Sequence, residues 1–249
     1  MQRNVTVNAL VLQTRRIGDY HKGISCITPQ CGLIDALVYG AYKGKGKISG
    51  ITEPFSQLDL HLYYNPVKKS YKVVDAEERA SFPAIHNDLP RFYRASLFSE
   101  IVIKSYGGGG DSRDIFTLLR DALTLLDTCS SARMECTVIQ FLWRFLILSG
   151  MNPELNYCGR CGRQVGLDEL LVFSQEENLF VCSRCSPEGN FTLNGGGRKY
   201  LAYTSRQTFE GAVTTGLVKS SVHPLRQLLL VMIQNFLEYP LNSLKNNLL

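Results

Sequence analysis

The sequence predicts a multi-domain α+β chain in which a small β-barrel precedes a set of helices and a cysteine-rich module lies among the helices. Three observations predict this arrangement. Residues 4–75 are rich in β-branched and aromatic residues, partly in alternation. From Arg91 onward, apolar residues recur at the spacing of a helix. Two Cys-x2-Cys pairs then interrupt this helical pattern before it resumes.

Residues 1–80 are predicted to form a barrel domain. Turn signals at Gly18-Asp19, Pro29, Gly32 and Asn65-Pro66 divide this part of the chain into about five short strands. The strand-like segments read VTVNALVLQTRRI, GISCITPQCGLIDALVYGAY, SQLDLHLYYN and KSYKVVDAE. Five such strands suit a Greek-key barrel of the OB-fold type, which commonly binds nucleic acid.

A helical domain is predicted in two parts, residues 81–153 and 191–249. Apolar residues at helical spacing predict five helices, at 91–106, 113–129, 133–150, 197–213 and 224–241. The third has a conventional ending, because Gly150 follows its last apolar residues and Pro153 lies just beyond.

The segment between these two parts, residues 154–190, predicts a metal module. Cys158 and Cys161 form one pair, Cys182 and Cys185 form another, and twenty residues separate the pairs. A two-residue gap lets a tight turn present two thiolates to one ion, and two such turns complete a four-cysteine zinc site. Four thiolates leave no position for water, so we expect one structural Zn²⁺ ion. The intervening segment LLVFSQEENLFVC predicts a hairpin that returns the second pair to the first.

The other metal-ligand residues show no comparable spacing. Cys26, Cys31, Cys129 and Cys136 are expected to be small buried hydrophobes. The four histidines are scattered, and none stands in a His-Glu-x-x-His pair or beside a plausible nucleophile. The longest apolar run, LLLVMI, is far shorter than the roughly 20 residues that span a bilayer. No secretion signal is visible at the amino terminus, so a cytoplasmic protein with no membrane contact is expected.

The lysine- and glycine-rich stretch VYGAYKGKGKISG, residues 38–50, is the best candidate for a nucleotide-binding loop, which would indicate an enzyme. A phosphate-binding P-loop needs four residues between its glycine and a Gly-Lys-Ser/Thr triplet. Counted from Gly40, the second glycine would fall on Lys45, and the pair Gly46-Lys47 is followed by Ile48, which has no hydroxyl for magnesium. No nucleophile elbow or acid–base pair stands out elsewhere. A protein that is not an enzyme is therefore expected.

The charge distribution favours a polyanionic partner. Lys and Arg exceed Asp and Glu by 11 to 7 in residues 1–80 and by 6 to 2 in residues 191–249, whereas the middle of the chain is mildly acidic. Lysines and arginines that follow phosphates, with aromatic rings that stack on bases, hold single-stranded nucleic acid. The candidate contacts in the barrel are Arg15, Arg16, Lys22, Tyr42, Lys43, Lys45 and Lys47. Alternatively, the tyrosines are packing residues and the lysines are exposed turn residues.

The order of these parts resembles that of the RecO family of bacterial recombination mediators. The resemblance is most specific at TRRIGDYHKGISCITPQCGLIDALVYGAYK, which is similar to the family's opening hairpins, and at CGRCG…FS…VCSRC, which is similar to its zinc module. The turn before Cys182 reads QEENLF, where the family often has a glycine-rich turn. The helical regions match in pattern only.

The resemblance implies a role in DNA repair and recombination without covalent chemistry. RecO-like proteins bind single- and double-stranded DNA, anneal complementary strands and associate with RecR. They also engage the C-terminal tail of single-stranded DNA-binding protein and help RecA to load onto coated DNA, so a nucleoid-associated location is expected. The alternative is a zinc-stabilised RNA- or protein-interaction module in transcription or translation.

Overall fold

The computed structural model describes residues 3–43, 47–107, 110–151, 153–166, 168–186 and 191–244. The chain forms two compact units. The first contains the barrel, the helices up to α4 and the short 3-10 helix η1, and the second contains α5 to α8 and the strands β6 to β8. The predicted helical segment 81–153 therefore contributes to both units.

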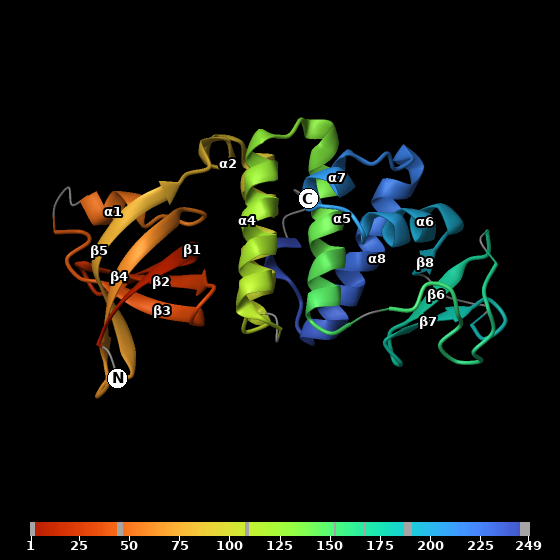
Figure 1. The fold of residues 1–249 in the computed structure, drawn as a ribbon, viewed down its shortest axis with the longest axis horizontal. Helices are drawn as coiled ribbons and strands as arrows, with labels where there is room; N and C mark the ends of the chain where they lie inside the picture. Colours follow the sequence, from red (N-terminus) through yellow and green to blue (C-terminus); the bar gives the residue numbers. More distant parts are fainter. Residues whose placement is uncertain are drawn as a thin grey trace. The chain divides into compact units, whose positions relative to one another are not determined.

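The barrel is closed by five strands with one short helix between the third and fourth (Figure 1). Its elements are β1 Asn4–Ile17, β2 His21–Thr28, β3 Gly32–Val38, α1 Lys47–Ile51, β4 Gln57–Asn65 and β5 Ser70–Ala80. The strand order is β1-β2-β3-β5-β4, and β4 returns to pair with β1. All neighbouring strands are antiparallel except β3 and β5, which are parallel. This topology confirms the predicted OB-fold.

The barrel closes because alternate residues of each strand are apolar and face a common interior. On β1 the alternating residues Val7, Ala9 and Val11 are buried. Equivalent positions on the other strands complete the interior: Ile24, Cys26, Ile34, Ala36, Val38, Leu58, Leu60, Leu62, Val73 and Ala76. The side chains of Ile48 and Ile51 on α1 pack against this core. Cys26 is thus the small buried hydrophobe that the sequence predicts, whereas Cys31 is exposed.

The first unit continues with α2 Pro83–Asn87, α3 Leu89–Lys104 and α4 Ser112–Thr128. Asp88 begins α3 by accepting a hydrogen bond from the backbone N–H of Arg91 at 2.9 Å, an N-cap contact. The carboxylate of Glu100 on α3 accepts bonds from the backbone N–H groups of Asn242 (2.7 Å) and Ser243 (2.8 Å). These bonds hold η1 (Asn242–Leu244) against α3.

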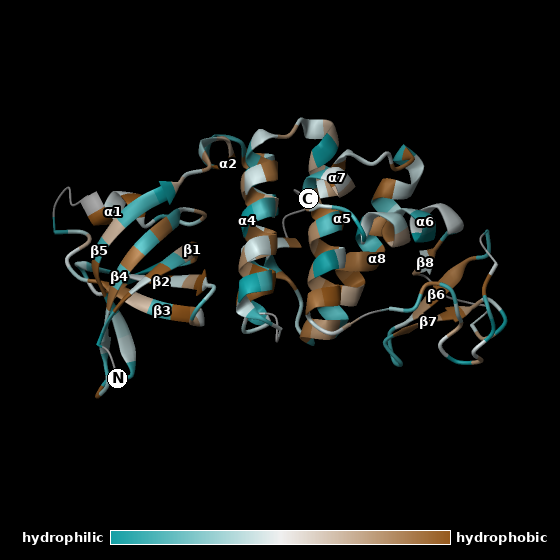
Figure 2. Cartoon of the chain, viewed as in Figure 1, coloured by the Kyte–Doolittle hydropathy of each residue, from teal (hydrophilic) through white to brown (hydrophobic). Residues whose placement is uncertain are grey.

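The second unit has its core between α5 Ser131–Leu148 and α8 Lys219–Leu237. Phe145 of α5 lies 6.0 Å from Phe141 and 6.4 Å from Phe236, measured between ring centroids. The strands β6 Leu171–Ser174 and β7 Leu179–Cys182 form the predicted hairpin, and β8 Thr192–Leu193 adds a third strand. In Figure 2 the strands β6 and β7 are coloured mostly as hydrophobic, in agreement with their buried side chains.

One helix prediction was wrong. The segment 197–213 forms two helices, α6 Gly195–Thr204 and α7 Phe209–Thr214. The break has a local cause, because the Thr208 hydroxyl accepts a bond from the backbone N–H of Gly211 and starts a new helix as its N-cap. Arg144 of α5 also donates to the carbonyls of Thr204 and Gln207, which stabilises the turn between the two helices.

Candidate functional site

The four paired cysteines come together in the second unit. Their Sγ atoms all lie within 4.8 Å of one another, and those of Cys161 and Cys182 are 3.9 Å apart. Four thiolates about 2.3 Å from one zinc ion in a tetrahedron would lie about 3.8 Å from each other. The donor set and its spacing therefore fit one metal ion that is coordinated only by protein thiolates.

Backbone turns place the thiols. The N–H of Gly162 donates to the carbonyl of Cys158 at 2.9 Å, and that of Cys185 donates to the carbonyl of Cys182 at 2.9 Å. Gly162 has a φ of +70°, which residues with a side chain rarely adopt. The N–H of Cys182 donates to Sγ of Cys158 at 3.3 Å, so a hydrogen bond joins the two turns. Cys182 is the last residue of β7, and the hairpin thus delivers the second pair to the first.

The thiols differ in how readily they lose a proton. The Arg163 side chain beside Cys182 lowers the pKa of that thiol to about 6, against the opposing effect of burial. The neighbouring Cys161 side chain, followed by burial, raises the pKa of Cys185 to about 12. A metal ion bound by all four sulfurs would require all four to be deprotonated, so binding of the ion would release protons from the cluster.

Arg198 on α6 ties this module to the helices of the same unit. Its side chain is only 4% exposed. Nε donates to the carbonyl of Leu155 at 2.9 Å, and Nη2 donates to that of Val165 at 3.2 Å. Nη1 donates to the carbonyls of Gly166 at 2.7 Å and Glu169 at 3.1 Å. One buried cation thus satisfies four backbone carbonyls on either side of the first cysteine pair. Nothing in the sequence pattern singled out this residue.

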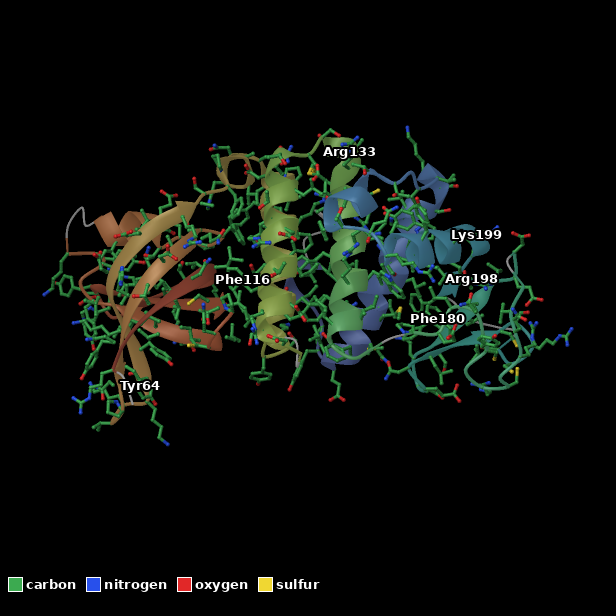
Figure 3. All side chains as sticks on the ribbon, in the orientation of Figure 1. Tyr64, Phe116, Arg133, Phe180, Arg198 and Lys199 are labelled. Carbon is green, nitrogen blue, oxygen red and sulfur yellow. The ribbon has the colours of Figure 1, made fainter. Side chains whose placement is uncertain are left out.

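Replacing Arg198 with methionine is expected to destabilise the second unit by about 3 kcal/mol, because the change leaves buried carbonyls without donors. The adjacent Lys199→Met is a matched control (Figure 3 labels both residues). Lys199 is exposed and pairs with exposed Asp168 at 3.5 Å, so its loss should cost less than about 0.5 kcal/mol. Urea denaturation of the two variants compares these losses. Equal losses would contradict the anchoring role of Arg198.

Three exposed tyrosines gather at one end of the barrel. Tyr20 lies in the turn between β1 and β2, and Tyr39 and Tyr42 follow β3; the exposed fractions are 50%, 50% and 42%. The N–H of Tyr42 donates to the carbonyl of Tyr20 at 3.1 Å, which joins the two segments. His21 accepts from the N–H of Gly40 at 3.0 Å, and its ring lies 5.0 Å from that of Tyr39 in an edge contact. Exposed rings of this kind can stack on nucleic-acid bases.

A cation lies over each of these rings. The distances to the ring centroids are 5.3 Å for Arg16 Cζ over Tyr42, 5.1 Å for Lys43 Nζ over Tyr20 and 5.0 Å for Lys72 Nζ over Tyr39. These are cation–π contacts. We call these six residues, Arg16, Tyr20, Tyr39, Tyr42, Lys43 and Lys72, the aromatic–basic cluster. It combines positive charge with exposed aromatic faces, the two features by which protein surfaces bind single-stranded nucleic acid.

The predicted contact residues do not all lie in this cluster. Arg15, Arg16, Tyr42 and Lys43 are exposed. Lys45 lies outside the described residues; Lys47 is the first residue of α1, and its side chain is not described. Lys22 differs from the others because it is 1% exposed and donates a hydrogen bond to Glu53 inside the first unit. Its buried position does not agree with the predicted direct contact to phosphate.

No pattern in the sequence indicates a role for Lys72. Lys72 is 29 positions from Lys43 along the chain, but in the parallel pairing of β3 with β5 it lies opposite Leu37. That pairing places its ammonium group over Tyr39, which follows β3. Only the closure of the barrel brings this lysine to the cluster. An alternating pattern on β5 could have shown that Lys72 faces outward, but not that it meets Tyr39.

Within the described residues, no helix is both long enough and apolar enough to cross a membrane. An OB-fold barrel, followed by helices that carry a four-cysteine module, defines the class of the chain: a multi-domain OB-fold protein with a four-cysteine cluster that could hold a metal ion.

Comparison with known proteins names the family within this class. The family model described as Recombination protein O N terminal matches residues 1–82, and that described as Recombination protein O C terminal matches residues 86–245. The chain therefore belongs to the RecO family, as the sequence motifs indicated.

Individual relatives carry the same name. A protein of an Exiguobacterium species named DNA repair protein RecO is 26% identical over 223 residues, which cover 89% of this chain and 86% of the relative. A protein of Desulfitobacterium hafniense with that name is 27% identical over 183 residues, which cover 74% of this chain. In the latter case the match spans 65% of the relative, which is less than two thirds of its length.

Proposed function

We propose that this chain is a non-enzymatic recombination mediator in DNA repair. It binds single- and double-stranded DNA, anneals complementary strands and helps RecA to load onto DNA that is coated by single-stranded DNA-binding protein. The observation that carries the proposal is the aromatic–basic cluster on the OB-fold barrel, in a chain of the RecO family.

The cluster supports strand binding in two ways. Arg16, Lys43 and Lys72 place positive charge at this exposed end of the barrel, where it can attract phosphates and offset the repulsion between two strands. The exposed rings of Tyr20, Tyr39 and Tyr42 offer faces for bases. Base stacking tolerates any sequence, as annealing of arbitrary complementary strands requires. None of these steps needs a bond to be made or broken.

The four-cysteine cluster supports a structural role for one Zn²⁺ ion. Cys158, Cys161, Cys182 and Cys185 would hold it, and no coordination position would be left for a substrate or water. When bound, the ion cross-links the two cysteine turns. The protein's own contribution is to place these turns, through the β6–β7 hairpin and the bonds from Arg198.

The proposed organisation has four segments: the DNA-binding barrel 1–80, a first helical part 81–153, the zinc module 154–190 and a second helical part 191–249. The proposed protein partners are RecR and the acidic C-terminal tail of single-stranded DNA-binding protein, with RecA acted on indirectly. A helical groove with a basic side chain is the kind of surface that would accept such a tail. A cytoplasmic, nucleoid-associated location follows from this role.

The proposal is tested by titrating the full chain with single-stranded DNA, duplex DNA and RNA of equal length at two salt concentrations. Binding to both DNA forms, with affinity that falls as salt rises, is expected. Annealing of complementary strands coated with single-stranded DNA-binding protein should be faster with the chain than without it. Binding to RNA alone, or no gain in annealing, would overturn the proposal in favour of an RNA- or protein-interaction module.

A further inference from the structure

Lys22 is an uncommon feature of the barrel because lysine side chains are rarely buried, and those that are buried need a partner for their charge. It lies on β2, and its side chain is only 2% exposed. Its ammonium group donates to Oε1 of Glu53 at 2.6 Å, to the carbonyl of Ser49 at 2.7 Å and to that of Thr52 at 3.4 Å. An ammonium group has three protons to donate, and three acceptors surround this one.

All three acceptors belong to α1 and the residues directly after it. The helix α1 is only five residues long, too short to be stable by itself in water. Ser49 and Thr52 provide carbonyls near its C-terminal end, where a cation is favoured. Ile51 packs against the barrel core. Lys22 is therefore the polar counterpart of this apolar contact, and both hold α1 on the barrel.

The same ammonium group also reaches the aromatic–basic cluster. It lies 5.9 Å from the centroid of the Tyr42 ring, which Arg16 also contacts. The chain passes from Tyr42 and Lys43 to Lys47, where α1 begins. Lys22 thus contacts both Tyr42, which precedes α1, and the C-terminal end of α1.

We infer that Lys22 and Glu53 form an internal anchor that positions Tyr42, with its neighbour Lys43, and α1 for nucleic acid, and that Lys22 itself is a positioning residue with no phosphate contact. This inference rests on the proposed function, because it assigns the inner support of the same DNA-binding surface. An ordered surface loses less conformational entropy when it binds, so the anchor raises affinity without touching the ligand.

For the Glu53→Gln variant, the anchor predicts a change in DNA affinity that is opposite in sign to the change expected from charge alone. Glu53→Gln removes one negative charge beside a basic surface. If Lys22 contacted phosphate directly, this change would release its ammonium group and tighten DNA binding. If Lys22 acts through the anchor, the change leaves the buried ammonium group without its carboxylate, loosens α1 and weakens binding.

The test measures the affinity of the full chain for single-stranded DNA with Glu53→Gln and with Asp19→Asn as the matched control. Asp19 is exposed in the β1–β2 turn, so the control removes the same charge near the same surface. We expect Glu53→Gln to weaken binding by about fivefold to tenfold. For Asp19→Asn, unchanged or slightly tighter binding is expected. Equal or tighter binding by Glu53→Gln than by the unaltered chain would overturn the anchor.

A double-mutant cycle separates positioning from a general loss of fold. Lys22→Met should weaken binding in the unaltered chain but have little effect where Tyr42, Lys43 and Lys47 are already alanine, because Lys22 acts through them. An undiminished effect in that background would contradict positioning.

Hydrogen exchange provides a readout without DNA. The Thr52 amide, bonded to the carbonyl of Ile48 at 3.2 Å, should exchange faster in Glu53→Gln. If this amide is unchanged, the anchor fails whether or not the chain binds DNA; if the unaltered chain binds no DNA, the proposed function fails instead.

Discussion

Replacing Cys182 with serine is expected to abolish binding of the metal ion and to lower the free energy of unfolding of the second unit by about 4 kcal/mol or more. Cys182 is fully buried at the end of β7, and its backbone N–H also bonds Sγ of Cys158. Among the described residues between α5 and β6, none belongs to a helix or strand, so the cross-link between the two cysteine turns is a large part of the stability of the module. Metal analysis of the purified chain should give one zinc ion in the unaltered protein and none in the variant.

Cys31→Ser is the control for this prediction. Cys31 is an exposed thiol of the barrel and lies outside the four-cysteine cluster. The control should keep one ion per chain and the unfolding transition of the unaltered protein. A strong chelator should reproduce the effect of Cys182→Ser in the unaltered chain and in the control. A chain that contains no metal, or whose unfolding midpoint does not respond to the chelator, would contradict the zinc assignment.

Simultaneous replacement of Lys43, Lys45 and Lys47 with alanine is expected to give the largest loss of DNA affinity. Each lysine that neutralises a phosphate releases a counterion, so the slope of log affinity against log salt should become less steep by up to about three units. Affinity for single-stranded DNA at moderate salt should fall by about one to two orders of magnitude. Equilibrium titrations at four salt concentrations provide both quantities.

A matched triple variant tests whether charge alone accounts for that loss. Lys199, Arg206 and Lys219 are exposed cations of the second unit. Their joint replacement with alanine changes the net charge of the chain by the same amount. This control should keep the slope of the unaltered protein. A slope that is unchanged in the lysine variant would remove residues 43–47 from the interface.

The barrel and the cysteine cluster could be predicted from sequence because local patterns specify them. The alternation of Val7, Ala9 and Val11 follows from the two-residue period of a strand and already implies a buried face. The two-residue gap in each cysteine pair is a property of one tight turn, and the hairpin between the pairs is also local. The topology and the clustered thiols confirm both predictions.

The broken helix at 197–213 shows where a periodic pattern misleads. Apolar residues continue at helical spacing through the segment, but this spacing cannot reveal that a polar residue in the middle acts as the N-cap of a new helix. Thr208 ends the pattern by capping α7, and Arg144, sixty positions earlier than Thr204, stabilises the turn. A contact of that sequence separation is invisible to a local period.

By itself, the sequence determined the order of the parts, the class of the barrel and the identity of the four thiols, because strand alternation, helical spacing and the Cys-x2-Cys gap are patterns of residues close together in the chain. Only the tertiary structure decided which cations face outward. Lys22 has the positive charge that a phosphate contact needs, but its side chain is buried and pairs with Glu53. Lys72, in contrast, is brought to Tyr39 by the closure of the barrel. Charge is a property of a residue, but exposure is a property of the fold, because a side chain reaches solvent or a partner only where packing of distant strands allows it.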